Sequence, residues 1–91
     1  MTDTQMLTSL KTDLGITVDA YDARLAELLK EATAAIIAEG AVDYDPSVEF
    51  ADAQLTIIYA RWLWSCRDTM VEMPRMLRWK LNNRVFGGQM A

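Results

Sequence analysis

The sequence predicts an all-α fold, a small bundle of about four helices with a long central third helix. Apolar residues recur at spacings of three and four, which is typical of helices with one buried face. Alternation with a period of two is scarce, and β-branched residues form only short clusters such as Ile57-Ile58. Glycine and proline residues separate the periodic segments, as expected at helix ends and starts.

The length of the chain, 91 residues, predicts a single domain over residues 1–91. A domain of this size buries only about 60–65% of its unfolded surface. Yet 52% of the residues are hydrophobic, and they include three Trp, three Tyr, two Phe and six Met. This is much apolar surface for a small monomer to cover, so the composition favours self-association.

The first two helices are predicted over residues 4–14 and 20–39. Thr2 or Thr4 is expected to cap the first helix, and Gly15 to end it. Asp19 is the expected N-cap of the second helix, and Gly40 follows its end. The predicted buried stripes are Met6, Leu7, Leu10 and Leu14 in the first helix and Tyr21, Leu25, Leu28, Leu29, Ala32, Ala35 and Ile36 in the second.

The third helix is predicted from Pro46, with Asp45 as its cap, to about residue 69. At about 100° per residue, it has two apolar sides, so it should be buried on both sides within the bundle or contact another subunit. One side contains Leu55, Ile58, Tyr59, Trp62, Leu63 and Cys66, and the other contains Phe50, Ile57 and Trp64.

The fourth helix is predicted to be short, from Pro74 to Arg84. Leu77, Leu81 and Val85 form its expected buried edge, whereas Arg78 and Trp79 should point elsewhere. After Gly87-Gly88, residues 87–91 are expected to form a mobile tail.

The residue types point away from catalysis, and we expect no enzyme, cofactor or metal. The sequence has no His and a single cysteine, Cys66, so it lacks the usual triads and zinc sites. The position of Cys66 beside apolar residues predicts a buried, inert thiol. The carboxylate pairs Asp43/Asp45 and Asp19/Asp22 could hold a divalent cation, but acids of loops and helix caps are the better interpretation. The single cysteine fits a reducing cytoplasm. Neither a secretory signal nor a membrane-spanning run is recognisable.

Charge is unevenly distributed along the chain. Residues 1–60 have three basic and eleven acidic side chains, a balance of −8, whereas residues 61–91 have a balance of +4. An acidic part and a basic part favour head-to-tail contacts between copies, which can close into a ring.

The basic end of the chain has three interpretations. We rank docking on a neighbouring protein subunit first, a solvated helix face second and nucleic-acid binding third. The acidic net charge of −4 disfavours the last, because phosphate neutralisation provides much of the affinity for DNA. Trp64 is either core or interface on this evidence, and Trp79 is expected at an interface. The candidate subunit or portal contacts are Phe50, Ile57, Trp64, Arg75, Arg78, Trp79, Lys80 and Arg84.

Four stretches in this order resemble the tailed-phage head–tail connector (adaptor) proteins. They are Met6–Ile16, Asp22–Ala32, Leu55–Trp64 with Arg67, and Met73–Arg84. The last stretch, a proline before a short basic helix, is the most specific of them.

This resemblance implies a structural virion protein at the head–tail interface, made in the host cytoplasm. Connectors of this family form a ring, commonly of twelve copies, beneath the portal protein. They extend the DNA channel and provide the platform for a stopper or tail-completion protein. DNA would pass through without specific binding, and an acidic channel lining would let it slide. The alternative is a small helical DNA-binding regulator that uses the basic C-terminal helix for recognition.

Overall fold

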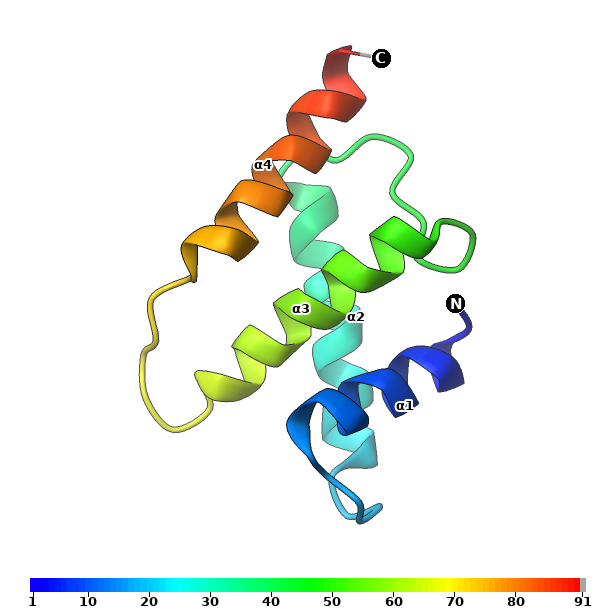
Figure 1. Cartoon of the computed structure of the whole chain (residues 1–91), viewed down its shortest axis with the longest axis vertical. Helices are drawn as coiled ribbons and strands as arrows, with labels where there is room; N and C mark the ends of the chain where they lie inside the picture. The colour runs from blue at the N-terminus through cyan, green and yellow to red at the C-terminus, as the bar shows by residue number, and fades with distance from the viewer. Residues whose placement is uncertain (91) are drawn as a thin grey trace.

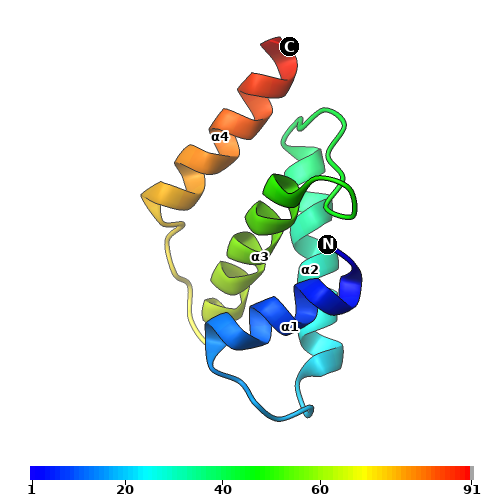
Figure 2. The same ribbon diagram turned by 45° about the vertical axis from the view of Figure 1, so that its right-hand side comes forward.

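A computed structural model describes the backbone of residues 1–90 and the side chains of residues 1–87. These residues form four α-helices and no β-strand, which confirms the predicted all-α class. The helices are α1 (Asp3–Leu14), α2 (Asp22–Ala38), α3 (Phe50–Ser65) and α4 (Arg75–Met90). Figure 1 shows α3 in the middle, with α2 crossing behind it and with α4 and α1 on opposite sides of it. After rotation, Figure 2 shows α4 on one side of α3 and α2 and α1 on the other.

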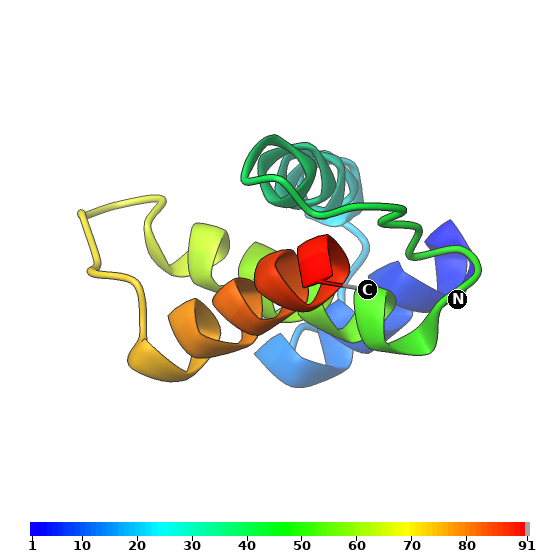
Figure 3. The same ribbon diagram turned by 90° about the horizontal axis from the view of Figure 1, so that it is seen from above.

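The central position of α3 follows from its contacts with all three other helices. The seen-from-above view of Figure 3 places α3 between α2 and α4. The core combines side chains from every helix and includes Leu10, Leu25, Ile36, Ile57, Leu77 and Leu81, all at most 1% exposed. Because α3 is packed on two sides, its apolar residues cannot all lie on one stripe.

Local signals define the ends of α1 as predicted. The Thr2 hydroxyl accepts a hydrogen bond from the Gln5 amide, and the Gln5 side chain accepts one from the Thr2 amide, which forms a capping box. Gly15 ends the helix with φ 71°, the left-handed conformation that glycine adopts at little cost.

The start of α2 differs from the prediction, because Asp19 does not cap it. The N-cap is Tyr21, and no side chain caps this helix. Instead, Lys11 Nζ lies 3.0 Å from Asp19 Oδ1 and 2.8 Å from Asp22 Oδ1. Both hydrogen bonds raise the pKa of Lys11, with that to Asp22 the larger cause. Asp19, in the loop before α2, and Asp22, the first residue of α2, therefore attach this part of the chain to α1.

The helix α3 is shorter at both ends than the sequence predicted. Asp45 and Pro46 begin a separate turn, in which the Asp45 carboxylate accepts hydrogen bonds from Ser47. The chain then becomes extended at Glu49, so α3 begins at Phe50. At the other end, the helix stops at Ser65, and the following linker folds back until the Trp62 indole N–H donates to the Val71 carbonyl at 3.0 Å.

The helix α4 is longer than predicted. It continues through Gly87 and Gly88 to Met90, so residues 87–90 are part of the helix and do not leave it as a separate tail. Glycine lowers helix stability only by about 1 kcal/mol per residue, which does not by itself end a helix. Ala91, the last residue of the predicted tail, lies outside the described residues.

Candidate protein interface

The inner side of α4 is fixed to α3. Leu77, Leu81 and Val85 are buried as predicted, at 1%, 0% and 8% exposure. Beside them, the Arg84 guanidinium donates to Asp52 Oδ1 through Nε at 2.8 Å. Its Nη2 also donates to the Val42 carbonyl at 2.6 Å, so one side chain joins α4, α3 and the loop that precedes α3.

Asp52 is the centre of a buried polar network at the start of α3. Only 3% of the residue is exposed, and its Oδ2 accepts a hydrogen bond from the Asp45 amide at 3.0 Å. The Tyr44 hydroxyl donates to the Asp52 carbonyl at 2.6 Å and also contacts the Thr56 hydroxyl. Burial raises the pKa of Tyr44 to about 12, and the hydrogen bond to Asp52 raises the pKa of Arg84.

This network corrects the prediction for Arg84, which the sequence placed among the interface candidates. Its guanidinium is used inside the subunit, with the side chain 23% exposed and its partner carboxylate only 4% exposed. The interaction joins residues 32 positions apart, so no local pattern could have identified it. Arg84 is therefore a structural residue that holds α4 in place.

The outer side of α4 carries large apolar side chains in solvent. Met76, Trp79 and Phe86 are 66%, 61% and 60% exposed. Trp79 and Phe86 are seven residues apart, so they lie on the same side of the helix, away from the buried Leu81. The exposed side chains of Arg75 and Lys80 accompany them. We call Met76, Trp79 and Phe86 the outer face of α4.

Arg78 lies at the edge between the two sides of α4. Its Nη1 is 3.8 Å from Glu39 Oε1, and both side chains are nearly half exposed. A solvent-exposed pair at this distance stabilises a fold by less than about 1 kcal/mol. Arg78 is consequently accessible to a neighbour, although it already has an acidic partner within the subunit.

The predicted stripe of Phe50, Ile57 and Trp64 does not form one surface. Ile57 is 1% exposed because both sides of the middle of α3 are covered, so its place among the interface candidates was wrong. Phe50, at the start of the helix, is 65% exposed and remains a candidate. Only Ile57, in the middle of the stripe, is enclosed, whereas Phe50 is exposed and Trp64 is half-buried.

Trp64 is half-buried and has partners within its own chain. Its ring packs edge-on against Tyr21, with centroids 5.5 Å apart and planes at 74°. The Arg67 guanidinium lies 4.3 Å from the centre of the same ring. These contacts join the end of α3 to the start of α2, so Trp64 has a structural role even with part of its ring in solvent.

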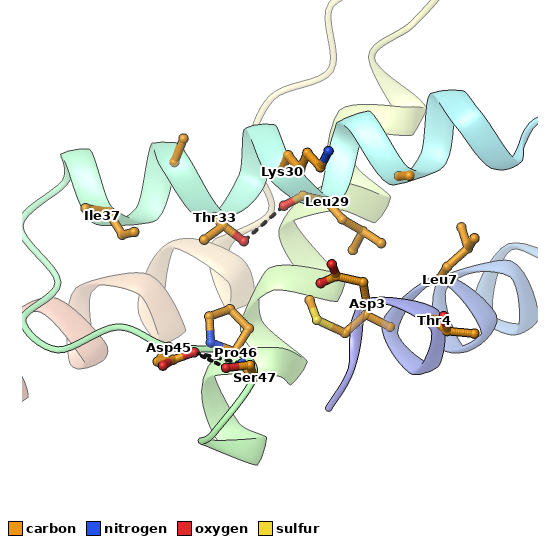
Figure 4. Close-up of a pocket in the computed structure, with 13 residues that line it drawn as sticks. Asp3, Thr4, Leu7, Leu29, Lys30, Thr33, Ile37, Asp45, Pro46 and Ser47 are labelled. Atoms are coloured by element: carbon orange, nitrogen blue, oxygen red, sulfur yellow. Dashed lines mark hydrogen bonds between the residues drawn. The ribbon is translucent and has the colours of Figure 1, made fainter.

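A groove of about 610 Å³ opens on the other side of α3, between α1 and α2. Figure 4 shows Leu7 and Leu29 projecting into this space, with the turn of residues 45–47 at one side. Most of the groove surface is apolar, and Asp3, Lys30 and Asp45 lie among its polar lining residues. The groove could not be predicted from the sequence, because its lining comes from three separate segments.

Two residues of the outer face were also missed. Phe86 follows Trp79 by seven positions, which is a usable helical signal, but the predicted end of the helix at Arg84 concealed it. Met76 precedes Trp79 by three positions and could have been included by the same reasoning. Because α4 continues past Arg84, Trp79 is not an isolated exposed side chain but part of an apolar face with Met76 and Phe86.

The acidic side chains and the cysteine that the sequence singled out have contacts within the described part of the chain. No group of three or more His, Cys, Asp or Glu side chains there could hold a metal ion. Asp19 and Asp22 contact Lys11, and Asp45 accepts hydrogen bonds from Ser47. Cys66 is only half-buried, contrary to the prediction, and its Sγ lies 3.6 Å from the Val71 carbonyl.

None of the helices within residues 1–90 has the length and apolar character needed to cross a membrane. Comparison with family models, with curated proteins and with solved structures found no match to this chain.

Proposed function

We propose that this chain is a self-assembling structural subunit of a tailed phage, a head–tail connector that forms a ring below the portal protein. The single observation that carries self-assembly in this proposal is the outer face of α4. Three large apolar side chains stand in solvent on a helix whose other side is fixed by Arg84 and Leu81. An ordered helix that exposes Trp and Phe is suited to bind another protein, because buried aromatic side chains provide much of the energy of such interfaces.

The peripheral position of α4 also supports association, because this helix packs chiefly on α3. The contrast between the acidic residues 1–60 and the basic α4 adds an electrostatic reason for copies to associate.

The phage assignment rests on the resemblance of the four stretches described above. It implies the portal protein and a stopper or tail-completion protein as partners, with the virion as the final location. In this role, DNA passes through the ring without specific binding. The expected neighbours of its gene are therefore a portal gene and a major capsid gene on one side and tail genes on the other.

Mass photometry of the purified chain over a range of concentrations tests the proposal. We expect a discrete oligomer at high concentration, or on addition of the portal protein encoded by the neighbouring gene. A chain that stays monomeric under both conditions contradicts it. Binding to DNA that weakens steeply with salt would instead favour the helical regulator.

A further inference from the structure

We infer that copies of this chain associate head to tail, with the outer face of α4 of one copy in the α1–α2 groove of the next. The inference rests on the proposed function as a self-assembling subunit and identifies the two surfaces that meet. The occupant of the groove is thus a second copy of the same chain.

The groove has the size and chemistry to receive aromatic side chains. Its volume of about 610 Å³ lies within the roughly 300–1,000 Å³ typical of sites that enclose organic ligands. Leu7, Leu29 and Ile37 provide apolar surface, and Ile37 is 49% exposed in the isolated subunit. Ala26 and Ala34 on α2 are small, so they leave room between the larger side chains. Such a groove fits rings that enter from outside.

The outer face of α4 has the complementary properties. Trp79 and Phe86 stand about 10 Å apart along the helix axis, as expected for seven residues at 1.5 Å rise. At about 60% exposure, each ring still offers roughly 100–150 Å² of surface to a partner. Together with Met76, they provide the apolar centre that a stable protein interface needs.

The charges of the two surfaces also favour contact between α4 of one copy and residues 1–60 of the next. The outer side of α4 carries Arg75 and Lys80, with Arg78 at its edge, and the described part of this helix has no acidic residue. The opposing residues 1–60 have a balance of −8, and Asp3 and Asp45 lie at the groove. Hydrogen bonds from Ser47 lower the pKa of Asp45 and keep it ionised. Two cations also lie at the groove: Lys30, and the Met1 ammonium, which donates to the Pro46 carbonyl. The attraction for the basic α4 of another copy therefore comes mainly from the acidic residues 1–60 as a whole.

The positions of the two surfaces explain why contact occurs between copies. In Figure 2, α4 lies on one side of α3, and α1 and α2 lie on the other. The outer face of α4 therefore cannot reach the groove of its own chain. Two different surfaces on opposite sides make a contact that repeats from copy to copy, which closes into a ring when the rotation allows.

Two complementary variants of the full chain test the inference. The face variant combines Trp79→Ala with Phe86→Ala, and the groove variant is Ala34→Arg, which adds bulk and positive charge at an exposed position of α2. We expect each change to raise the concentration for half-assembly by about ten-fold or more. Native mass spectrometry of an equimolar mixture should detect pairs with one copy of each variant and nothing larger, since only one intact contact remains.

Matched controls separate this effect from general damage. Met70→Ala removes an apolar side chain that is 94% exposed outside α4, and Ala23→Arg makes the groove change at an exposed site of α2 away from the groove. Both should assemble like the wild type. If circular dichroism shows that Ala34→Arg unfolds the chain, Thr4→Arg, at an exposed groove position of α1, replaces it.

The outcomes distinguish this inference from the proposed function. Wild-type assembly with unaffected face or groove variants overturns the head-to-tail contact and leaves the proposed function intact. A mixture that forms no mixed pair at the highest attainable concentration also overturns it. A wild-type chain that never assembles, alone or with portal protein, contradicts both.

Discussion

Arg84 and Asp52 form the ion pair that joins the last helix to the start of α3, with Nε 2.8 Å from Oδ1. The carboxylate side chain is 4% exposed and the arginine side chain 23% exposed. Arg84 also donates to the Val42 carbonyl, and Asp52 also accepts from the Asp45 amide. This pair therefore sets the orientation of α4 and, with it, the direction in which Trp79 and Phe86 project.

Replacing Arg84 should destabilise the fold. Arg84→Ala leaves the buried Asp52 carboxylate without its cationic partner, which costs about 2–4 kcal/mol of unfolding free energy. Urea denaturation followed by circular dichroism measures this loss. Arg61→Ala, at an exposed position of α3, is the control and should change stability by less than about 0.5 kcal/mol. Equal effects of the two substitutions would contradict the structural role of Arg84.

Stability should decline at alkaline pH because of Tyr44. Its pKa is raised to about 12, above the ordinary value of 10.0, so the folded state keeps the phenol proton that the unfolded chain releases. The folded state thus binds more protons between about pH 10 and 12, and stability falls as pH rises through this range. Below pH 10, the contribution is fully present.

Denaturation curves at several values from pH 9 to 12 test this effect, with Tyr44→Phe as the comparison. The variant lacks the ionisable hydroxyl, so its stability should depend less on pH in this range. Burial also raises the pKa of Tyr59, which makes Tyr59→Phe an informative second variant with the same sign. Identical pH profiles for wild type and Tyr44→Phe would rule out the assignment to Tyr44.

Gly15 and Gly87 should respond in opposite ways to alanine. Gly15 has φ 71°, a conformation that is strained for alanine, so Gly15→Ala should destabilise by about 1 kcal/mol even though the added Cβ meets no neighbour. Gly87 lies inside α4, and a Cβ there also has open space. Gly87→Ala should therefore stabilise the chain by about 0.5–1 kcal/mol. Thermal unfolding measures both changes in stability. A Gly87→Ala variant as stable as the wild type would contradict the prediction for Gly87.

Substitutions of Trp64 and Trp79 should have different effects, the first on folding and the second on assembly. Trp64→Ala removes the packing on Tyr21 and Arg67 and should cost about 1–3 kcal/mol of unfolding free energy. Trp79→Ala removes a ring that is 61% exposed and should change this free energy by less than about 0.5 kcal/mol, while it impairs assembly. Denaturation and mass photometry of both variants provide the test. If Trp79→Ala unfolded the subunit, Trp79 would be a core residue and not an interface residue.

Charge reversal at Arg78 should weaken assembly in a salt-dependent way. Arg78→Glu places a negative charge on the basic side of α4 and beside Glu39. The double variant Arg78→Glu with Glu39→Lys restores a pair within the subunit, so it isolates the effect on neighbours. We expect both to assemble poorly at low salt, with the difference from wild type reduced at about 1 M salt by screening. Unchanged oligomers at every salt concentration would contradict this role.

The local features of the fold were predictable because they depend on neighbours in sequence. The capping of α1 by Thr2, its end at Gly15 and the buried edge of Leu77 and Leu81 were all confirmed. Each follows from helical periodicity or from the conformation of one residue. Residues with two possible roles were harder: Asp19 is a good N-cap by type, but in the structure its carboxylate pairs with Lys11 and the helix begins after Tyr21.

The candidate interface was only partly predictable for a related reason. Exposure of Trp79 follows from its place opposite Leu81 on a single helix. The burial of Ile57 and the use of Arg84 inside the subunit depend on which helix covers which side of α3. Helical spacing identifies the sides of a helix but not what lies against them.

By itself, the sequence determined that this chain forms four helices and that its last helix is basic, with Trp79 away from the buried edge. The tertiary structure decided that Arg84 pairs with Asp52, that Ile57 is core and that α1 and α2 leave a groove between them. The reason is the range of the forces involved. Caps and apolar periodicity act within one or two helical turns, whereas buried ion pairs and grooves exist only after distant helices pack together.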